Sequence, residues 1–122
     1  MSITAVAPQL RTTDLSSTIR FYTEKLGFVL EFRFENFYAG VRTGAYLIHL
    51  KQIDDADPSV AFVTEGGHMH LYFDTTGVVA FAEHLKALGV PLTRDVHDTP
   101  WQTKEFVVQD DQGHTLYFGE SK

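Results

Sequence analysis

Apolar and polar residues alternate along several short stretches of the chain, and this period of two is typical of half-buried β-strands. The clearest alternation covers residues 28–34, where Phe28, Leu30, Phe32 and Phe34 fall on one predicted face. Because the stripe is strongly apolar, we interpret it as core. Further strands are expected at 3–11, 37–42, 45–51, 68–73 and, with a weaker pattern, 91–96. Pro8 cannot donate to a sheet, so 3–11 is expected at an edge.

Two stretches instead carry apolar residues at helical spacing. The first contains Leu15, Ile19, Tyr22 and Leu26, and the second contains Val78, Phe81, Leu85 and Leu88. A glycine follows each stretch and suits the end of a helix. Residues 12–14 and 74–76 offer Thr and Asp side chains as N-caps.

The last part of the chain, residues 100–120, predicts a β-hairpin. Two apolar runs flank Asp110–Gly113, where Asp folds back on nearby backbone N–H groups and Gly accepts a positive φ. Residues 97–100 are expected to form a loop before it. Residues 53–67, rich in Asp, Pro and Gly, are interpreted as a connection with a short extended piece at 60–63.

The two halves of the chain share one order of elements: a strand, a capped helix ending in Leu-Gly, then three strands. The two Leu-Gly pairs lie about half the chain apart. We therefore predict an α+β fold of two paired β-α-β-β-β modules, roughly 1–52 and 66–122, joined by 53–65 in a single domain, 1–122.

Composition narrows the possible partners. A net charge of −6 argues against nucleic acid and would favour a cationic ligand. The chain has no cysteine, so it lacks thiolate zinc ligands, and no apolar run approaches the length of a membrane span. We expect a soluble, cytoplasmic protein that does not associate with membranes.

Two motifs give this plan a family resemblance. The series Asp14-Leu15, Phe21-Tyr22 and Leu26-Gly27-Phe28 is similar to the first helix of the vicinal oxygen chelate superfamily, and 110–118 is similar to its closing hairpin. That superfamily includes glyoxalase I, fosfomycin-resistance transferases, extradiol dioxygenases and bleomycin-resistance proteins. The resemblance covers residues 3–120 and implies an open, curved eight-stranded sheet with a central cleft. It also implies that His114 stands at a turn position tolerating a left-handed backbone.

Residues 35–41, Pro100-Trp101 with Glu105-Phe106, and 118–120 resemble the bleomycin-resistance branch in particular. In that branch a homodimer holds a planar aromatic drug between aromatic side chains without chemistry. By position, Trp101, Tyr38 and Phe32 or Phe34 would line the groove. Gln102 stands where the branch has Gly. A packing role for Trp101 competes with the binding role.

The superfamily's enzymes hold one divalent metal with four strand residues, and these positions fall on Ala7, His49, His70 and Tyr117. Only His49 and His70 could ligate Zn, Ni, Co or Fe, and the usual carboxylate is replaced by Tyr117. A register two residues different would offer Gln9 and His68 instead. His84 and His97 are most simply surface residues.

Three hypotheses follow. The first is non-catalytic binding of a small, partly aromatic, cationic compound without a cofactor, through Trp101, Tyr38, Phe32, Phe34, His49, His70 and Tyr117. The alternative is a lyase, transferase or dioxygenase dependent on one divalent metal at His49 and His70. The third is a folded dimer whose ligand site is vestigial.

Overall fold

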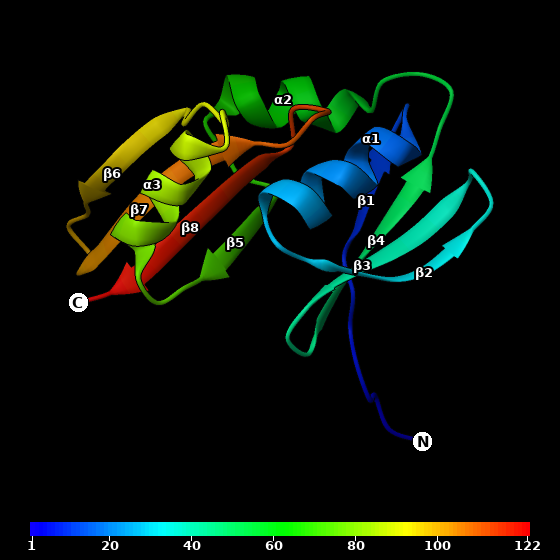
Figure 1. Ribbon diagram of the computed structural model, residues 1–122, viewed down its shortest axis with the longest axis horizontal. Coiled ribbons are helices and arrows are strands. Elements are labelled where there is room, and N and C mark those ends of the chain that lie inside the picture. Colours follow the sequence, from blue (N-terminus) through cyan, green and yellow to red (C-terminus); the bar gives the residue numbers. More distant parts are fainter. The chain divides into compact units, whose positions relative to one another are not determined.

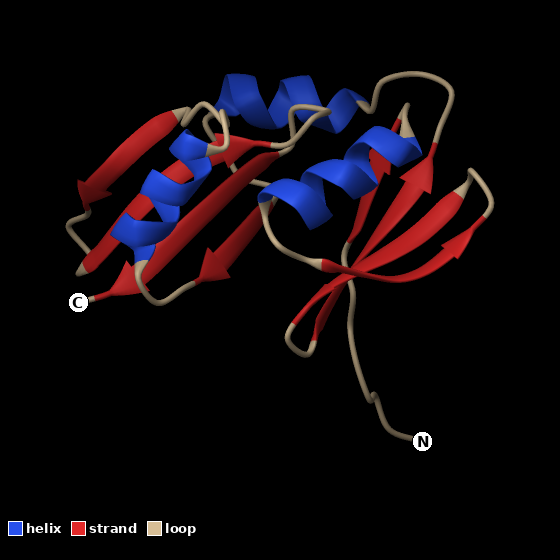
Figure 2. Ribbon diagram, in the orientation of Figure 1, coloured by secondary structure: helices blue, strands red, loops and turns tan.

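The computed structural model describes all residues 1–122 and divides them into two compact units, residues 1–57 and 58–122. Each unit contains one four-stranded sheet with a helix packed on one face (Figures 1 and 2). The predicted α+β class and the repeated β-α-β-β-β order are confirmed. None of the helices combines the length and the apolar character that crossing a bilayer requires.

The first unit follows the order predicted for a single module. It contains β1 (Gln9–Thr12), α1 (Leu15–Arg20), the π-helical turn η1 (Phe21–Lys25), β2 (Val29–Phe34), β3 (Tyr38–Thr43) and β4 (Tyr46–Gln52). The sheet order is β1-β4-β3-β2, with β1 parallel to β4 and the other pairs antiparallel. Helix α1 therefore connects two strands that run in the same direction and covers one face of the sheet between them (Figure 1).

The core of the first unit lies between α1 and the covered face of its sheet. Leu15 on α1 and Tyr22 on η1 are buried, as are Val41 and Leu50 on the strands. The predicted N-cap forms, since the Asp14 side chain accepts the Ser17 N–H. The opposite face of this sheet, which we call the open face of the first unit, has no helix on it.

A β-bulge in β2 changes the predicted alternation of 28–34. Leu30 pairs with Val41, while Phe32 pairs with Gly40, so Glu31 is the extra residue. Residues paired directly across antiparallel strands share a face. Leu30 therefore lies on the helix side and Phe32 on the open face. The prediction of a single core stripe was wrong, and Phe34 is 58% exposed.

The second unit begins with an additional helix. It contains α2 (Pro58–Gly66), β5 (Leu71–Asp74), α3 (Val78–Ala87), β6 (Arg94–Asp98), β7 (Thr103–Gln109) and β8 (Thr115–Ser121). The sheet order is β5-β8-β7-β6, with β5 parallel to β8. Phe106 and Phe118 stack at 5.0 Å between ring centres, and the Phe81 ring of α3 meets the Phe118 ring edge-on. These rings fill the space beneath α3.

Several predicted boundaries were wrong. Strand β1 begins at Gln9 rather than at Ile3, and His97 belongs to β6 rather than to a loop. The extended piece expected at 60–63 is part of α2, in which Pro58 takes the first position and no residue is buried. The cap of α3 comes from Glu120, which accepts the N–H groups of Gly77 and Val78 at 2.9 and 3.1 Å, instead of from residues 74–76.

The closing hairpin forms as predicted. The Asp110 carboxylate accepts the backbone N–H groups of Gln112 and His114, both at 2.9 Å, and Gly113 has a φ of 94°. Gly113 thus takes the left-handed conformation that the resemblance assigned to His114. Gln102 also has a positive φ, 68°. The loop before β7 therefore keeps the backbone conformation that glycine would adopt most easily.

Candidate functional site

The open face of the first unit gathers four of the predicted ligand-binding residues. Phe32, Phe34, Tyr38 and His49 come from the three consecutive strands β2, β3 and β4. The Phe32 ring stacks on Tyr38 with 6.3 Å between centres, and meets His49 edge-on at 5.6 Å. Phe34 follows at 5.7 Å from Phe32. The sheet therefore presents a continuous aromatic surface, which we call the aromatic face.

Gly40 is what lets the Phe32 ring lie flat against the sheet. A Cβ atom at this position would overlap the ring, whose Cζ would lie only 2.7 Å away. Gly40 pairs with Phe32 on one side and with His49 on the other. The absence of a side chain in the middle strand thus creates the space in which rings from the two neighbouring strands meet.

A chain of hydrogen bonds fixes the polar part of the aromatic face. Gln9 Nε2 donates to the Tyr38 hydroxyl at 3.0 Å, and that hydroxyl lies 2.9 Å from His49 Nδ1. Because an amide nitrogen only donates, all three groups are satisfied when Tyr38 donates to Nδ1. His49 then carries its proton on Nε2, and Nε2 makes no hydrogen bond within the structure. His49 can therefore offer one N–H group to a ligand.

In the second unit, Trp101 takes part in a cluster that the sequence interpretation missed. The Glu105 Oε2 atom accepts hydrogen bonds from Tyr72 at 2.7 Å, Thr103 at 2.9 Å and the Trp101 indole at 3.2 Å. Glu105 is buried, whereas Trp101 is 67% exposed. We call these four residues the Glu105 cluster. Trp101 is thus held at its polar edge while most of its ring meets solvent, and the predicted packing role does not describe it.

The close approach of Tyr72 to Glu105 depends on a second glycine. A Cβ atom at Gly119 would overlap the Tyr72 hydroxyl and come within 3.2 Å of Glu105 Cγ. Gly119 pairs with Glu105, so the tyrosine side chain crosses the empty position to reach the carboxylate. A glycine inside a strand often marks a place where another group approaches closely, so Gly119 was the sequence signal available for this contact.

Opposite effects set the charge state of the cluster. Burial raises the pKa of Glu105, but the hydrogen bonds from Tyr72, Trp101 and Thr103 lower it more, so its pKa falls below the ordinary value. Burial and the hydrogen bond to Glu105 raise the pKa of Tyr72 to about 12. At neutral pH the cluster therefore holds an ionised carboxylate beside a neutral phenol.

His70 has both ring nitrogens engaged inside the second unit. The Thr115 N–H donates to His70 Nδ1 at 3.1 Å, so the proton resides on Nε2, which lies 3.3 Å from Ser59 Oγ. The ring also meets the His114 ring edge-on at 4.9 Å. Neither nitrogen is directed to an open metal position, and His70 acts here as a link between β5, β8 and α2.

The remaining predicted positions do not add metal ligands. Ala7 precedes β1, and His68 is exposed in the turn before β5. Tyr117 is half-buried on β8, paired with Tyr72 and Val107. No group of three or more His, Cys, Asp or Glu side chains lies close enough together to hold a metal ion. With one imidazole nitrogen open and no carboxylate, the first unit alone does not supply a catalytic donor set.

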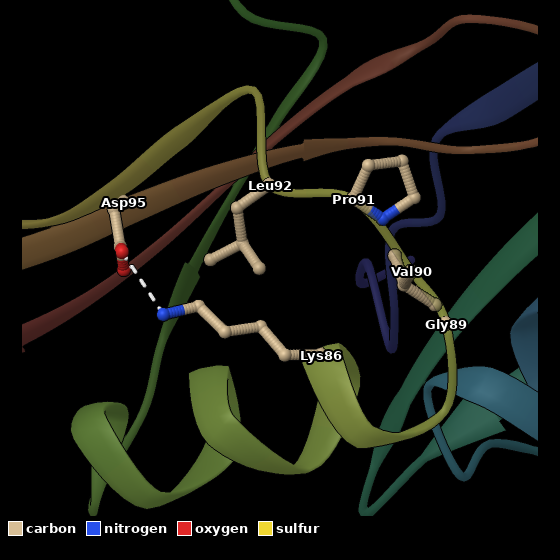
Figure 3. A pocket seen from close by; sticks show the side chains of 6 residues that line it. All are labelled: Lys86, Gly89, Val90, Pro91, Leu92 and Asp95. Atoms are coloured by element: carbon tan, nitrogen blue, oxygen red, sulfur yellow. Dashed lines mark hydrogen bonds and ion pairs between the residues drawn. The ribbon is translucent and has the colours of Figure 1, made fainter.

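A surface hollow lies away from these residues, at the end of α3 in the second unit. It is lined by Lys86, Gly89, Val90, Pro91, Leu92 and Asp95, and the Lys86–Asp95 ion pair of 2.9 Å crosses it (Figure 3). Its only charged groups neutralise each other, and none of the predicted site residues contributes to it. The hollow therefore offers no distinct chemistry.

Solved structures similar to this chain include both binding proteins and enzymes. The bleomycin-binding protein of Streptomyces verticillus, complexed with copper(II)-bleomycin, matches with 21% identity and a TM-score of 0.74, covering 100% of this chain and 99% of its own. Lactoylglutathione lyase of Agrobacterium tumefaciens matches with 17% identity and a TM-score of 0.75, covering 98% and 96%. A glyoxalase-related enzyme of Clostridium phytofermentans gives 18% and 0.80, covering 100% and 98%. At these identities, the likeness establishes the fold.

Among curated proteins, none matches the chain significantly. The family model described as glyoxalase/bleomycin resistance protein/dioxygenase superfamily matches residues 3–118, almost the whole chain. The repeated β-α-β-β-β units agree with that match. The protein therefore belongs to the glyoxalase/bleomycin resistance protein/dioxygenase superfamily.

Proposed function

We propose that this protein binds a small, partly aromatic compound without transforming it. The observation that carries the proposal is the aromatic face, where rings of Phe32, Phe34 and Tyr38 adjoin an imidazole with one unused N–H. Flat rings stack favourably on exposed aromatic side chains, and one directed polar group fixes orientation. Trp101, which is exposed on the second unit, stays a prediction as a ligand-binding residue of that unit.

The structural neighbours support a binding role in general terms. One of them is a bleomycin-binding protein solved with its copper(II)-bleomycin ligand. In our proposal the present chain acts by sequestration, as a cytoplasmic homodimer, and protection against a toxic compound is the role it would serve. Light scattering at micromolar concentration should then give twice the chain mass of 13.8 kDa.

The test is a calorimetric titration with three probes: copper(II)-bleomycin, acridine and the 10-methylacridinium cation. At least one probe should bind the wild-type protein. Phe34→Ala should weaken that binding about tenfold, because one stacked ring with its buried area contributes on the order of 1.5 kcal/mol. Phe34 is 58% exposed, so its removal should leave the fold intact.

Phe37→Ala is a matched control, since Phe37 is 56% exposed in the turn before Tyr38 and its ring contacts none of the rings of the aromatic face. It should leave the affinity unchanged. Equal losses in the two variants would show that the aromatic face is not the binding surface. Failure of all three probes to bind would remove the proposal for planar aromatic compounds.

A divalent-metal enzyme is the second candidate, and one observation favours it. His49 has its Nδ1 held by Tyr38 and no hydrogen bond at Nε2. Metal binding at Nε2 would take the other tautomer, in which Nδ1–H donates to the Tyr38 hydroxyl, as metal-ligating histidines donate their second ring N–H. Elemental analysis of protein purified without chelator decides between the candidates. About one divalent ion per chain, lost in His49→Ala, would favour the enzyme and call for activity assays, whereas a chain that stays empty after incubation with Zn, Ni, Mn and Fe would exclude it.

A further inference from the structure

The Glu105 cluster contains a buried charge without a cationic partner. All three hydrogen bonds reach the same oxygen, Oε2, and none reaches Oε1. None of the ion pairs in the structure involves Glu105, although acidic residues elsewhere pair with Arg42, Lys86, Lys104 and Lys122. Buried charges are normally paired with a charge of opposite sign, so the unpaired Glu105 carboxylate indicates a position for a cation.

Oε1 is open to a partner from outside the chain. Every buried side-chain nitrogen or oxygen has a hydrogen-bond partner except His114 Nε2, so Glu105 Oε1, which has none, retains contact with solvent. The basic residue that pairs with Glu105 across the sheet is His97, whose Nδ1 lies 2.9 Å from the Asp95 carbonyl oxygen. No side chain of the protein therefore occupies the free oxygen.

The groups beside the carboxylate suit an organic cation. Tyr72 is 36% exposed and Trp101 is 67% exposed, and each is anchored to Oε2 by its polar edge. The anchoring places two aromatic rings next to a fixed negative charge. Aromatic rings attract cations through their π faces, and a carboxylate in a partly desolvated position adds a direct charge interaction. A neutral aromatic ligand would gain only the stacking of its rings on Trp101 and Tyr72, without either of these charge interactions.

We propose that Glu105, Trp101 and Tyr72 form a recognition site for the positively charged nitrogen of an aromatic organic cation. The inference rests on the proposed function, because it assigns the charge of the compound that the protein binds. The simplest competing role for Glu105 is to hold the loop that carries Trp101 through its hydrogen bonds. That role predicts no preference between a cation and a neutral molecule of the same shape.

The experiment compares 10-methylacridinium, a permanent cation, with acridine, which has nearly the same shape and is uncharged at about pH 8. The wild-type protein should bind the cation at least tenfold more tightly, and the preference should fall as salt is added. Glu105→Gln should reduce the preference at least fivefold, because it weakens binding of the cation more than binding of acridine. Glu83→Gln, an equal change of net charge at an exposed residue of α3, should keep the preference.

A second variant covers the case in which Glu105→Gln does not fold, which thermal melting would show. Trp101→Leu removes an exposed ring and keeps the carboxylate, and it should weaken binding of 10-methylacridinium more than that of acridine. Equal affinities for the two compounds, or a preference that is undiminished in Glu105→Gln or in Trp101→Leu, would overturn the site. Acridine binding that Phe34→Ala weakens would then still support the proposed function, whereas binding of neither compound would remove both.

Discussion

The two units share one order of strands, and they differ in the polar groups on the sheet face that lies away from α1 or α3. In each unit the first strand lies parallel to the last strand. Gln9 pairs with His49 between β1 and β4 of the first unit, and Tyr72 pairs with Tyr117 between β5 and β8 of the second. In the first unit the polar groups form a neutral chain. In the second they converge on an ionised carboxylate. The same sheet geometry thus supports a neutral and a charged arrangement, and only side-chain choice separates them.

Each arrangement depends on one glycine, and replacing these glycines gives the largest expected effect. Gly119→Ala would force Tyr72 away from Glu105 and lose a charge-assisted hydrogen bond, which costs about 2 kcal/mol in unfolding free energy. Gly40→Ala would displace the Phe32 ring and lose aromatic contacts worth about 1 kcal/mol. Urea unfolding of both variants measures the two losses. A larger loss in Gly40→Ala would contradict the idea that charge distinguishes the units.

In addition to the Asp14 cap of α1, the last strand of each unit supplies a side chain that accepts N–H groups where a helix begins. These two contacts repeat the contrast and should differ in pH dependence. The Leu15 N–H donates to the Gln52 amide at 2.8 Å, whereas Gly77 and Val78 donate to the Glu120 carboxylate. Those two backbone hydrogen bonds lower the pKa of Glu120. A lowered folded-state pKa gives stability that is present above the unfolded value of about 4.3 and is lost as pH falls through the folded value.

Glu120→Gln should therefore lower the unfolding free energy at neutral pH, and its difference from the wild type should shrink as the pH falls below about 4. Gln52→Ala should lower stability by an amount that does not vary over the same range, because an amide does not titrate. Urea titrations at a series of pH values provide both curves. A constant deficit in Glu120→Gln would show that the carboxylate charge does not stabilise α3.

The smallest expected effect is spectroscopic. Trp101 is the single tryptophan, and its indole N–H is bound to Glu105. Glu105→Gln should weaken that anchor, increase solvation of the ring and shift its emission to longer wavelength by a few nanometres. Tyr38→Phe, which changes only the first unit's polar chain, should leave the emission unchanged. A shift in both variants would mean that the two arrangements are not independent.

The sequence was sufficient for the elements whose local signals agree with their packing. The Asp110–Gly113 turn and the capped helix at Leu15 contain the residue types that their backbone geometry needs, and both form as predicted. Helix α2 was missed because it buries no residue, so its apolar positions carry no regular stripe. The bulge at Glu31 was missed because the apolar and polar residues still alternate in the sequence there. The extra residue nevertheless moves the side chains after it to the other face of the sheet.

The candidate site was predicted only in part, because some of its residues are recognisable by type and others are placed only by the strand register. Aromatic residues are recognisable by type, so Tyr38, Phe32, Phe34 and Trp101 could be assigned, although their binding role remains a prediction. Glu105 could not, because a single Glu in an alternating strand usually points to solvent. Its burial depends on Gly119 and on Tyr72, which reach it from other strands and become neighbours only through the register.

The bulge in β2 also has a consequence for protein engineering. Phe28, which is buried, and Phe32, on the open face, belong to one uninterrupted apolar periodicity, yet the extra residue Glu31 separates them into different environments. Substitutions before the bulge are constrained by volume in the core, whereas those after it are constrained only by what the face must contact. A library aimed at new ligands can therefore vary the exposed position 34, and position 32 with loss of its ring contacts to Tyr38 and His49, provided that the chain length between 28 and 32 is kept.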